Sequence, residues 1–275
     1  MMSKTVGAYC EAILQRPELR GKLSPAETLL EDRIERPLRD WSAPARTAEL
    51  LPRSGGNRLP RPGSLSDPAA RAECLARFAH HELAAVELFA WAILRWPELP
   101  AELRRGWLAT LAEEQLHCSL YLERLAAHGA ELGDFQLSDY FWKLAPAIDS
   151  APDGPKAFLA AMGLTLEQAN LDFTLTYRDA FREAGDEESA LVCERVHRDE
   201  VRHVSLANHW LQALSPAGTS DLQAYQEHVP FPLGPARAKG RRCDPAARRA
   251  AGLSEALITR LQGARSTQEK GHLDA

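Results

Sequence analysis

The chain has 275 residues, a formal net charge of -5 and 45% hydrophobic residues. This composition is typical of a globular domain, and the mild negative charge gives no general attraction to nucleic acid. No apolar run is long enough to cross a bilayer, and the first residues lack the pattern of a secretory signal, so we expect a cytoplasmic protein. The five cysteines form no Cys-x-x-Cys pair, which argues against a disulfide framework and against a rubredoxin-type iron centre.

Residues 1–66 are predicted to form an arm that packs on the rest of the chain. A short helix is expected from about Thr5 to Gln15, and a second from Ser24, where Ser-Pro-Ala-Glu has the form of a capping box with a first-turn proline. Between Arg36 and Pro68, the density of Pro, Gly and Arg favours an extended strap. A linker to a separate partner is the alternative.

Four long helices are predicted within residues 67–216. Caps, first-turn prolines and terminal glycines bound them, and the expected ranges are 67 to before Pro97, 100–129, 155–185 and 186–215. A long connection separates the second helix from the third, and it contains the aromatic residues Tyr140, Phe141 and Trp142. We expect two helical hairpins joined by one long crossover.

Residues 217–275 are predicted to form an extension whose last dozen residues are disordered. Asp244-Pro245 opens one short helix and Ser254 caps another. Residues 237–249 contain six basic side chains and one acidic, a net charge of +5 (6 − 1). Pairing of this segment with the acidic helices is the favoured interpretation; docking of RNA or of a phosphate-bearing substrate is the alternative.

The motif Glu-x-x-His occurs four times, at 114/117, 194/197, 200/203 and 269/272. On a helix its two side chains lie one turn apart on the same face. The first and third copies continue the apolar stripes of the second and fourth helices, whereas the other two lie off such a stripe. Leaving these groups buried and unpaired would cost on the order of several kcal/mol. We therefore predict that Glu114, His117, Glu200 and His203 bind metal, with a buried ion pair as the alternative.

An internal repeat supplies further ligands, because residues 80–87 resemble residues 165–172. Glu82 lies 32 residues before Glu114, and Glu167 lies 33 residues before Glu200. One Glu from each of two helices and Glu-x-x-His from each of two others is the ligand set of di-iron and di-manganese carboxylate bundles. These oxygen-rich ligands suit iron or manganese better than zinc. The expected cofactor is two iron ions, with manganese or a mixed Mn/Fe pair as alternatives.

This ligand pattern resembles the ferritin-like superfamily, and within it rubrerythrin, demethoxyubiquinone hydroxylase, the tRNA hydroxylase and the ribonucleotide reductase small subunit. The whole chain is more similar still to an uncharacterised bacterial ferritin-like domain family. The stretches that carry this similarity are Phe78–Leu83, Asp139–Trp142, Glu167–Phe173 and Pro230–Gly234. The resemblance covers nearly the full length and implies an all-α fold, an antiparallel four-helix bundle with one long crossover. It implies no settled reaction.

The resemblance also implies roles for the acid that precedes each ligand glutamate. By similarity to the ribonucleotide reductase small subunit, Asp199 would orient His117, and Glu113 would orient His203. An imidazole ligand generally needs such an acceptor on its other nitrogen to fix its tautomer.

Four more residues are candidates for supporting roles. Glu87 and its repeat equivalent Asp172 lie five residues after the ligand glutamates, about 140° around the helix, so we expect hydrogen bonds from helix to helix. Tyr121 and Tyr177 are candidate redox or hydrogen-bond partners, with ordinary packing as the alternative.

The function expected from these observations is an oxygen- or peroxide-activating oxidoreductase of hydroxylase type. It would act on a small molecule with an external electron donor, because the chain carries no rubredoxin-type relay. A ferroxidase or iron-handling protein is one alternative, and a non-enzymatic scaffold with a structural metal is another. No membrane association is expected, and homodimer formation stays open.

Overall fold

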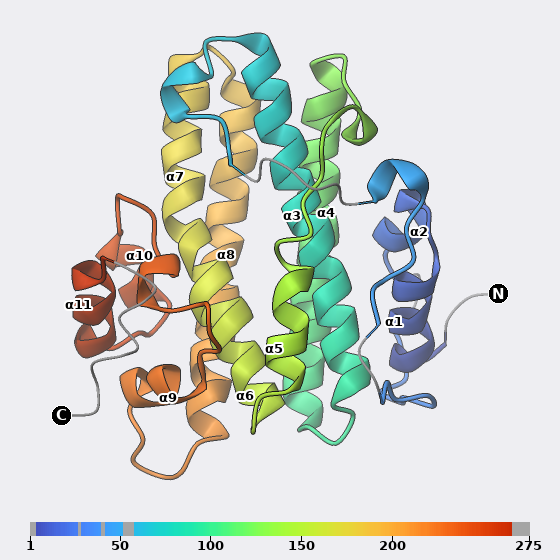
Figure 1. The fold of residues 1–275 in the computed structure, drawn as a ribbon, viewed down its shortest axis with the longest axis vertical. Coiled ribbons are helices and arrows are strands. Elements are labelled where there is room, and N and C mark those ends of the chain that lie inside the picture. The colour runs from blue at the N-terminus through green and yellow to red at the C-terminus, as the bar shows by residue number, and fades with distance from the viewer. Residues whose placement is uncertain (1–3, 27–28, 40–41, 52–57, 266–275) are drawn as a thin grey trace. The chain divides into compact units, whose positions relative to one another are not determined.

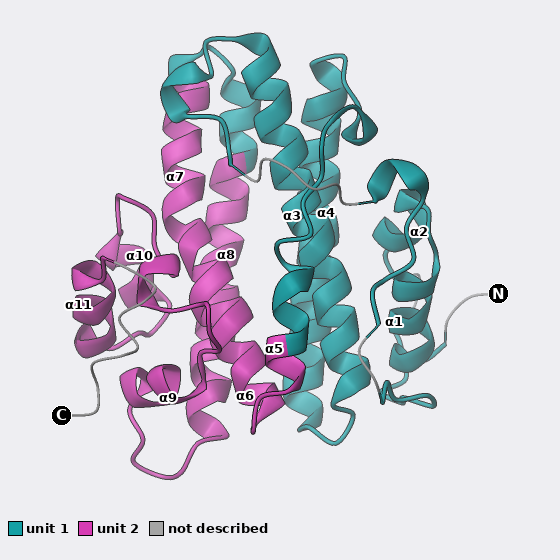
Figure 2. Ribbon diagram, in the orientation of Figure 1, with its two compact units in different colours: residues 1–146, 183–192 teal, residues 147–182, 193–275 magenta. Residues whose placement is uncertain are grey.

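The computed structural model describes residues 4–26, 29–39, 42–51 and 58–265. Their regular structure is helical (Figure 1), which confirms the all-α prediction. Thr5 and Glu31 form an isolated parallel bridge, and no β-strand occurs in the described ranges. None of the described helices has the length and apolar character needed to cross a bilayer. The chain divides into two compact units (Figure 2), residues 1–146 with 183–192, and residues 147–182 with 193–275.

Two long helices dominate the first unit, α3 (Pro68–Arg95) and α4 (Ala101–Ala127). α3 begins where predicted, because the Asp67 carboxylate accepts a hydrogen bond from the Ala69 amide at 3.0 Å and proline occupies the first turn. A short turn returns the chain, so α4 packs along α3 in the antiparallel direction. The remaining elements that begin within residues 1–146 are α1 (Val6–Gln15), α2 (Leu19–Leu23), α5 (Ala145–Asp149) and the 3₁₀ turns η1 (Ala48–Leu50), η2 (Pro62–Ser64), η3 (Leu132–Asp134) and η4 (Trp142–Leu144).

The arm differs from the prediction at Ser24, because a helix ends there instead of beginning. Ser24 is the C-cap of α2 in an extended conformation, and its hydroxyl donates to the Arg20 carbonyl at 2.7 Å. Its own carbonyl accepts from the Tyr9 hydroxyl at 3.1 Å. Glu27, the other member of the predicted capping box, lies outside the described residues. The local capping signal is thus overridden by hydrogen bonds within the folded arm.

The described part of the strap contains the two 3₁₀ turns η1 and η2 between irregular segments, and it bonds to its own unit through the main chain. The amide of Leu38 donates to the Leu94 carbonyl at 3.0 Å, and that of Ala45 donates to the Leu14 carbonyl at 2.8 Å. These bonds connect the strap to the end of α3 and to the end of α1.

The second unit contains a long helix that changes its winding. It runs as α6 (Gly154–Phe158), the π-helix η5 (Leu159–Glu167) and α7 (Gln168–Glu183), where the sequence predicts one regular α-helix. A Cβ atom at Gly163 would lie 2.1 Å from the Ala207 Cβ atom, so glycine allows η5 to approach α8 (Glu187–Ala213) closely. π-Helical turns are rare and occur frequently at functional sites.

The second unit ends in short helices, α9 (Asp221–His228), α10 (Pro245–Ala250) and α11 (Glu255–Gly263), with a 3₁₀ turn η6 (Pro235–Arg237). α10 and α11 begin after the predicted caps Asp244 and Ser254. The sequence analysis missed α9, although Ser220 and Gln223 form a capping box before it. The last ten residues, within the segment predicted to be disordered, lie outside the described residues.

Basic residues of the segment 237–249 form ion pairs within the second unit. Arg242 lies 2.8 Å from Asp179, and Arg248 lies 2.9 Å from Asp172. Arg249 pairs with Glu255 on α11. The expected pairing with acids of the preceding helices is therefore observed for Arg242 and Arg248.

Asp186, immediately before α8, combines a helix cap with ion pairs inside the first unit. Its carboxylate accepts from the Ser189 amide at 3.1 Å, from Arg124 at 3.1 Å and from His128 at 2.8 Å. We expect Asp186→Ala to lower the free energy of unfolding by about 1–2 kcal/mol, the range for loss of an N-cap. Urea denaturation measures this, and Asp67→Ala, the exposed cap of α3, should cost less.

The effect of Asp186 should depend on pH. Burial raises the pKa of Asp186, but hydrogen bonds from Ser189 and His128 and the charge of Arg124 outweigh burial and hold the pKa below its ordinary value. Its stabilisation is therefore present above the ordinary aspartate pKa, about 3.9, and is lost as the pH falls through the lower folded-state value. The gap between wild type and variant should be constant from pH 7 to about 5 and shrink below about 4. A gap that is already closing at pH 6 would contradict this assignment.

Candidate metal centre

The first unit gathers three of the predicted ligands, Glu82 from α3 with Glu114 and His117 from α4. All three are buried, with exposed fractions of 5%, 0% and 0%. Each offers one ligand atom within 4.8 Å of the others. His117 Nδ1 lies 3.3 Å from Glu114 Oε2 across one helical turn. The packing of α3 on α4 thus completes a cluster of two carboxylates and one imidazole.

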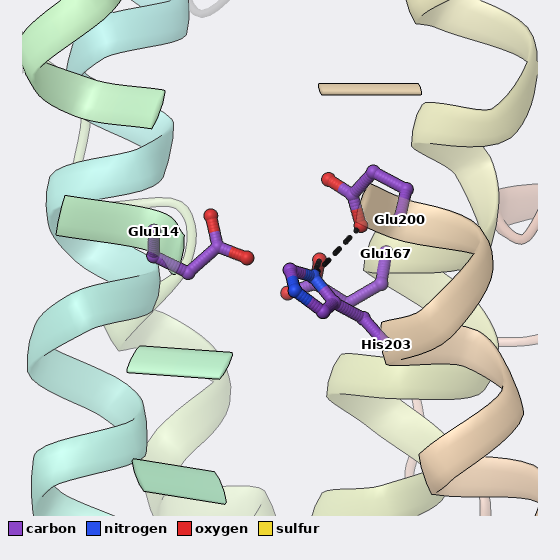
Figure 3. A group of neighbouring side chains, drawn as sticks. All are labelled: Glu114, Glu167, Glu200 and His203. Carbon is purple, nitrogen blue, oxygen red and sulfur yellow. Dashed lines mark ion pairs between the residues drawn. The ribbon is translucent and has the colours of Figure 1, made fainter. Parts of the chain in front are cut away.

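The second unit gathers the equivalent three, Glu167 from the end of η5 with Glu200 and His203 from α8. These three side chains point toward one another in Figure 3, which also draws Glu114 of the first unit. His203 Nδ1 lies 3.4 Å from Glu200 Oε2 and 3.6 Å from Glu167 Oε2. All three are buried. The π-helix ends at Glu167, so the irregular winding leads directly into this cluster.

The chemistry of both clusters fits a metal ion. Glu167 Oε2 is buried and has no hydrogen-bond partner among the described residues. A buried carboxylate oxygen in that state is costly, and a bound cation would offset the cost. Each cluster offers two carboxylates and one imidazole and no thiolate. This set suits iron or manganese better than a structural zinc ion.

Comparison with known proteins places the chain in a family. The family described as "Protein of unknown function (DUF455)" matches residues 15–259. The chain belongs to this family. It is also similar to an "Uncharacterized protein" of Haemophilus influenzae (strain ATCC 51907 / DSM 11121 / KW20 / Rd), with 32% identity over 153 residues. The match covers 52% of this chain and 51% of that protein, so the chain spans about half the length of this curated relative. No solved structure matches the chain.

In this member of the DUF455 family, Glu87 lies at the centre of a buried cluster of charged side chains. Lys22 Nζ lies 3.0 Å from its Oε1, and Arg46 contacts both oxygens at 3.2 and 2.5 Å. Trp142 Nε1 donates to its Oε2 at 2.9 Å. The Glu87 and Lys22 side chains are 0% exposed and that of Arg46 is 3% exposed. Burial lowers the pKa of Lys22, although the charge of Glu87 opposes this.

Asp172, the repeat equivalent of Glu87, lies at the centre of a second buried cluster. Arg248 donates to both of its oxygens, at 3.1 and 2.9 Å, and both side chains are 0% exposed. The amides of Gly240 and Asp244 also donate to it, at 2.8 and 2.6 Å.

The helices to which Glu87 and Asp172 bond lie outside the four long ones, because Lys22 belongs to α2 and Arg248 to α10. Glu87 neutralises cations of the N-terminal arm, and Asp172 neutralises a cation of the C-terminal extension. A buried carboxylate or a buried cation without its counter-charge is strongly destabilising, so each of these acids pairs with a buried cation.

The acids that precede the ligand glutamates have contacts of their own. Asp199 is buried, and its carboxylate accepts from Arg195 at 2.7 Å and from Arg202 at 2.6 Å, one turn away on either side. Glu113 is half-buried on α4. The roles of these two acids in orienting the histidines stay predictions.

The two candidate tyrosines are buried within their units. Tyr121 is 1% exposed, and its ring centroid lies 5.2 Å from that of Phe78. Tyr177 is 4% exposed on α7. The contact of Tyr121 with Phe78 is the ordinary packing that the alternative interpretation expects. A redox role for either tyrosine stays a prediction.

Two amide side chains beside the ligands were missed from sequence. Asn170 Nδ2 donates to Glu200 Oε1 at 2.8 Å. Gln115, between Glu114 and His117, accepts from the Tyr9 hydroxyl at 2.9 Å and donates to the Lys22 carbonyl at 2.7 Å. The available signal for Asn170 was its position three residues after Glu167, one turn along the same face.

Two titratable groups next to the ligands are held in their neutral form. Burial, and then the charge of Arg46, lowers the pKa of His80 well below its ordinary value. Arg46 Nη1 lies 3.0 Å from His80 Nε2, so this nitrogen is the acceptor. Burial raises the pKa of the Cys118 thiol, with the charges of Glu82 and Glu114 adding to the effect. The Cys118 thiolate is thus disfavoured.

Proposed function

We propose that this protein is a ferritin-like metalloprotein whose two clusters together hold a dinuclear carboxylate centre, a di-iron centre in the first instance. The observation that carries the proposal is the presence of a buried Glu/Glu/His cluster at equivalent places of an internal repeat, one in each unit. A single cluster would be accounted for by a buried ion pair. Two of them supply the complete ligand set of a di-iron or di-manganese carboxylate bundle.

Each residue has a proposed role in holding the ions. Glu82, Glu114, Glu167 and Glu200 would hold the ions through their carboxylates, and His117 and His203 would each bind one ion through the imidazole. When bound, two ferrous ions supply two electrons to dioxygen or peroxide, which is the chemistry of an oxidoreductase. The protein's part is to fix the six ligands on long helices and to keep them buried from bulk water.

The proposed reaction uses an external electron donor and a small-molecule substrate. The five cysteines are buried, and none forms a disulfide or belongs to a Cys-x-x-Cys pair. The chain therefore lacks the thiolate set of a rubredoxin-type relay. Electrons would have to come from a separate reductant.

The proposal is tested by replacing one ligand, Glu200. The control replaces Glu194, which begins the neighbouring Glu-x-x-His motif. We expect Glu200→Ala to lose at least one metal ion per chain, measured by elemental analysis of protein produced with iron. Glu194→Ala is the matched control, because Glu194 also stands three residues before a histidine on α8 but bonds to Arg182 at 2.8 Å on the surface. The control should keep its metal. Full metal content in Glu200→Ala, or equal loss in both variants, would exclude this ligand assignment.

A further inference from the structure

We propose that Asn170 makes the two halves of the centre unequal, so that the cluster of the second unit binds its metal ion more tightly than that of the first. The inference rests on the proposed function and deepens it, because it assigns an order of metal loading. Asn170 is a positioning residue in this account: it acts through Glu200.

The two carboxylate oxygens of Glu200 have different contacts. The Asn170 amide donates to Oε1 at 2.8 Å, while Oε2 lies 3.4 Å from His203 Nδ1. A carboxylate with one oxygen held in this way has a fixed rotamer and presents the other oxygen toward the imidazole. A metal ligand must be ionised, and in that state the Glu200 carboxylate makes this hydrogen bond one of the stronger, charge-assisted kind.

The position of Asn170 is itself fixed by the helix. It lies in the first turn of α7, three residues after Glu167, so its side chain shares a face with that ligand. Its carbonyl accepts from the Thr174 hydroxyl at 2.5 Å, and the same hydroxyl lies 3.1 Å from His197 Nδ1. The amide therefore approaches Glu200 from an ordered part of the chain.

The first unit has no amide at the equivalent position. The two repeat glutamates are 85 residues apart (167 − 82), and the same offset pairs Asn170 with Ala85. Ala85 is 3% exposed, and its methyl group cannot donate a hydrogen bond. The repeat thus preserves the ligands of the two clusters and differs at a residue that would orient one of them.

This difference predicts unequal affinities. Glu200 is already ordered before the metal arrives, so less conformational freedom is lost when it binds. Groups that orient a metal ligand typically contribute about 10–100-fold to metal affinity. We expect the cluster of Glu167, Glu200 and His203 to fill first and the cluster of Glu82, Glu114 and His117 to fill second.

The experiment is an anaerobic calorimetric titration of metal-free, full-length protein with Co²⁺, which binds such ligands without redox chemistry. Wild type should bind two ions in two resolved steps. Asn170→Ala should weaken the tighter step about tenfold and leave the weaker step and the total of two ions unchanged. Asn170→Leu, which keeps the branched shape and the number of side-chain heavy atoms but removes the donor, should behave in the same way.

Asn208→Ala is the matched control. Asn208 also lies in the second unit, on α8 five residues after His203, but its amide donates to the Gly252 carbonyl at 2.9 Å. This variant should keep both binding steps even if it melts at a lower temperature. Circular dichroism of the metal-free proteins checks that each variant is folded.

The contradicting results are distinct from one another. Wild-type affinity in Asn170→Leu would show that the side chain acts by packing and not as a hydrogen-bond donor, and weakening of the second step alone would reverse the proposed order. Either result, or two equal sites in wild type, overturns the inference and leaves the dinuclear centre in place. A wild-type protein that binds neither Co²⁺ nor Fe²⁺ would overturn the proposed function and this inference with it.

Discussion

Glu87→Ala should lower the free energy of unfolding by about 3–5 kcal/mol, the range for breaking a buried ion pair. The substitution leaves two buried cations, Lys22 and Arg46, without their shared carboxylate, and it removes the acceptor of the Trp142 indole. Both cations belong to the arm and the strap, so the loss should fall first on those segments. Guanidinium chloride denaturation gives the change in stability, and limited proteolysis between residues 16 and 50 should accelerate.

The control for this prediction lies on the same helix. Glu73 pairs with Arg77 one turn away, and its side chain is 40% exposed, so Glu73→Ala should cost less than about 1 kcal/mol. Glu87→Gln should also be strongly destabilising, because it keeps an acceptor for Trp142 but leaves the two cations uncompensated. If Glu87→Ala lowers the free energy of unfolding by less than about 1 kcal/mol, both cations become hydrated in the variant and the buried ion pair is not the source of stability.

Asp172→Ala should have an effect of similar size, about 3–5 kcal/mol, in the second unit. It leaves Arg248 buried without a counter-charge and removes the acceptor of the Gly240 and Asp244 amides. The segment that connects η6 to α10 should loosen. Faster amide hydrogen exchange and faster proteolysis in residues 238–250 would report this directly.

Two further variants separate the charge of Asp172 from its packing. Asp179→Ala breaks the pair with Arg242, in which both side chains are more than 40% exposed, and should cost less than about 1 kcal/mol. In Asp172→Leu with Arg248→Met, both charges are replaced by apolar groups, and part of the lost stability should return. A double variant that is less stable than Asp172→Ala would argue that geometry outweighs charge at this position.

The ligand clusters could be predicted within each unit because their signal is local. Glu114 with His117, and Glu200 with His203, are one helical turn apart, and each pair continues an apolar stripe, so periodicity alone places them together. Glu82 and Glu167 required the internal repeat. The starts of α3, α10 and α11 followed from caps and prolines, whose effects act within one turn.

The partners of Glu87 and Asp172 could not be predicted in this way. Lys22, Arg46 and Arg248 lie 41 to 76 residues from the acids they neutralise, and no periodicity connects them. The winding of η5 has no local signature either, because it accompanies the close approach of Gly163 to Ala207, which lies in another helix. The helix predicted to begin at Ser24 is wrong because Ser24 ends α2, where its hydroxyl bonds to the Arg20 carbonyl and its carbonyl accepts from the Tyr9 hydroxyl.

The most direct test of the central claim is the metal content of the purified chain, with its optical spectrum before reduction, after reduction and after return to air. We expect two iron ions per chain and a near-ultraviolet absorption band that bleaches on reduction and returns in air. Protein without metal, or with one redox-silent zinc ion, would contradict the dinuclear centre and leave the two buried Glu/Glu/His clusters as ion pairs.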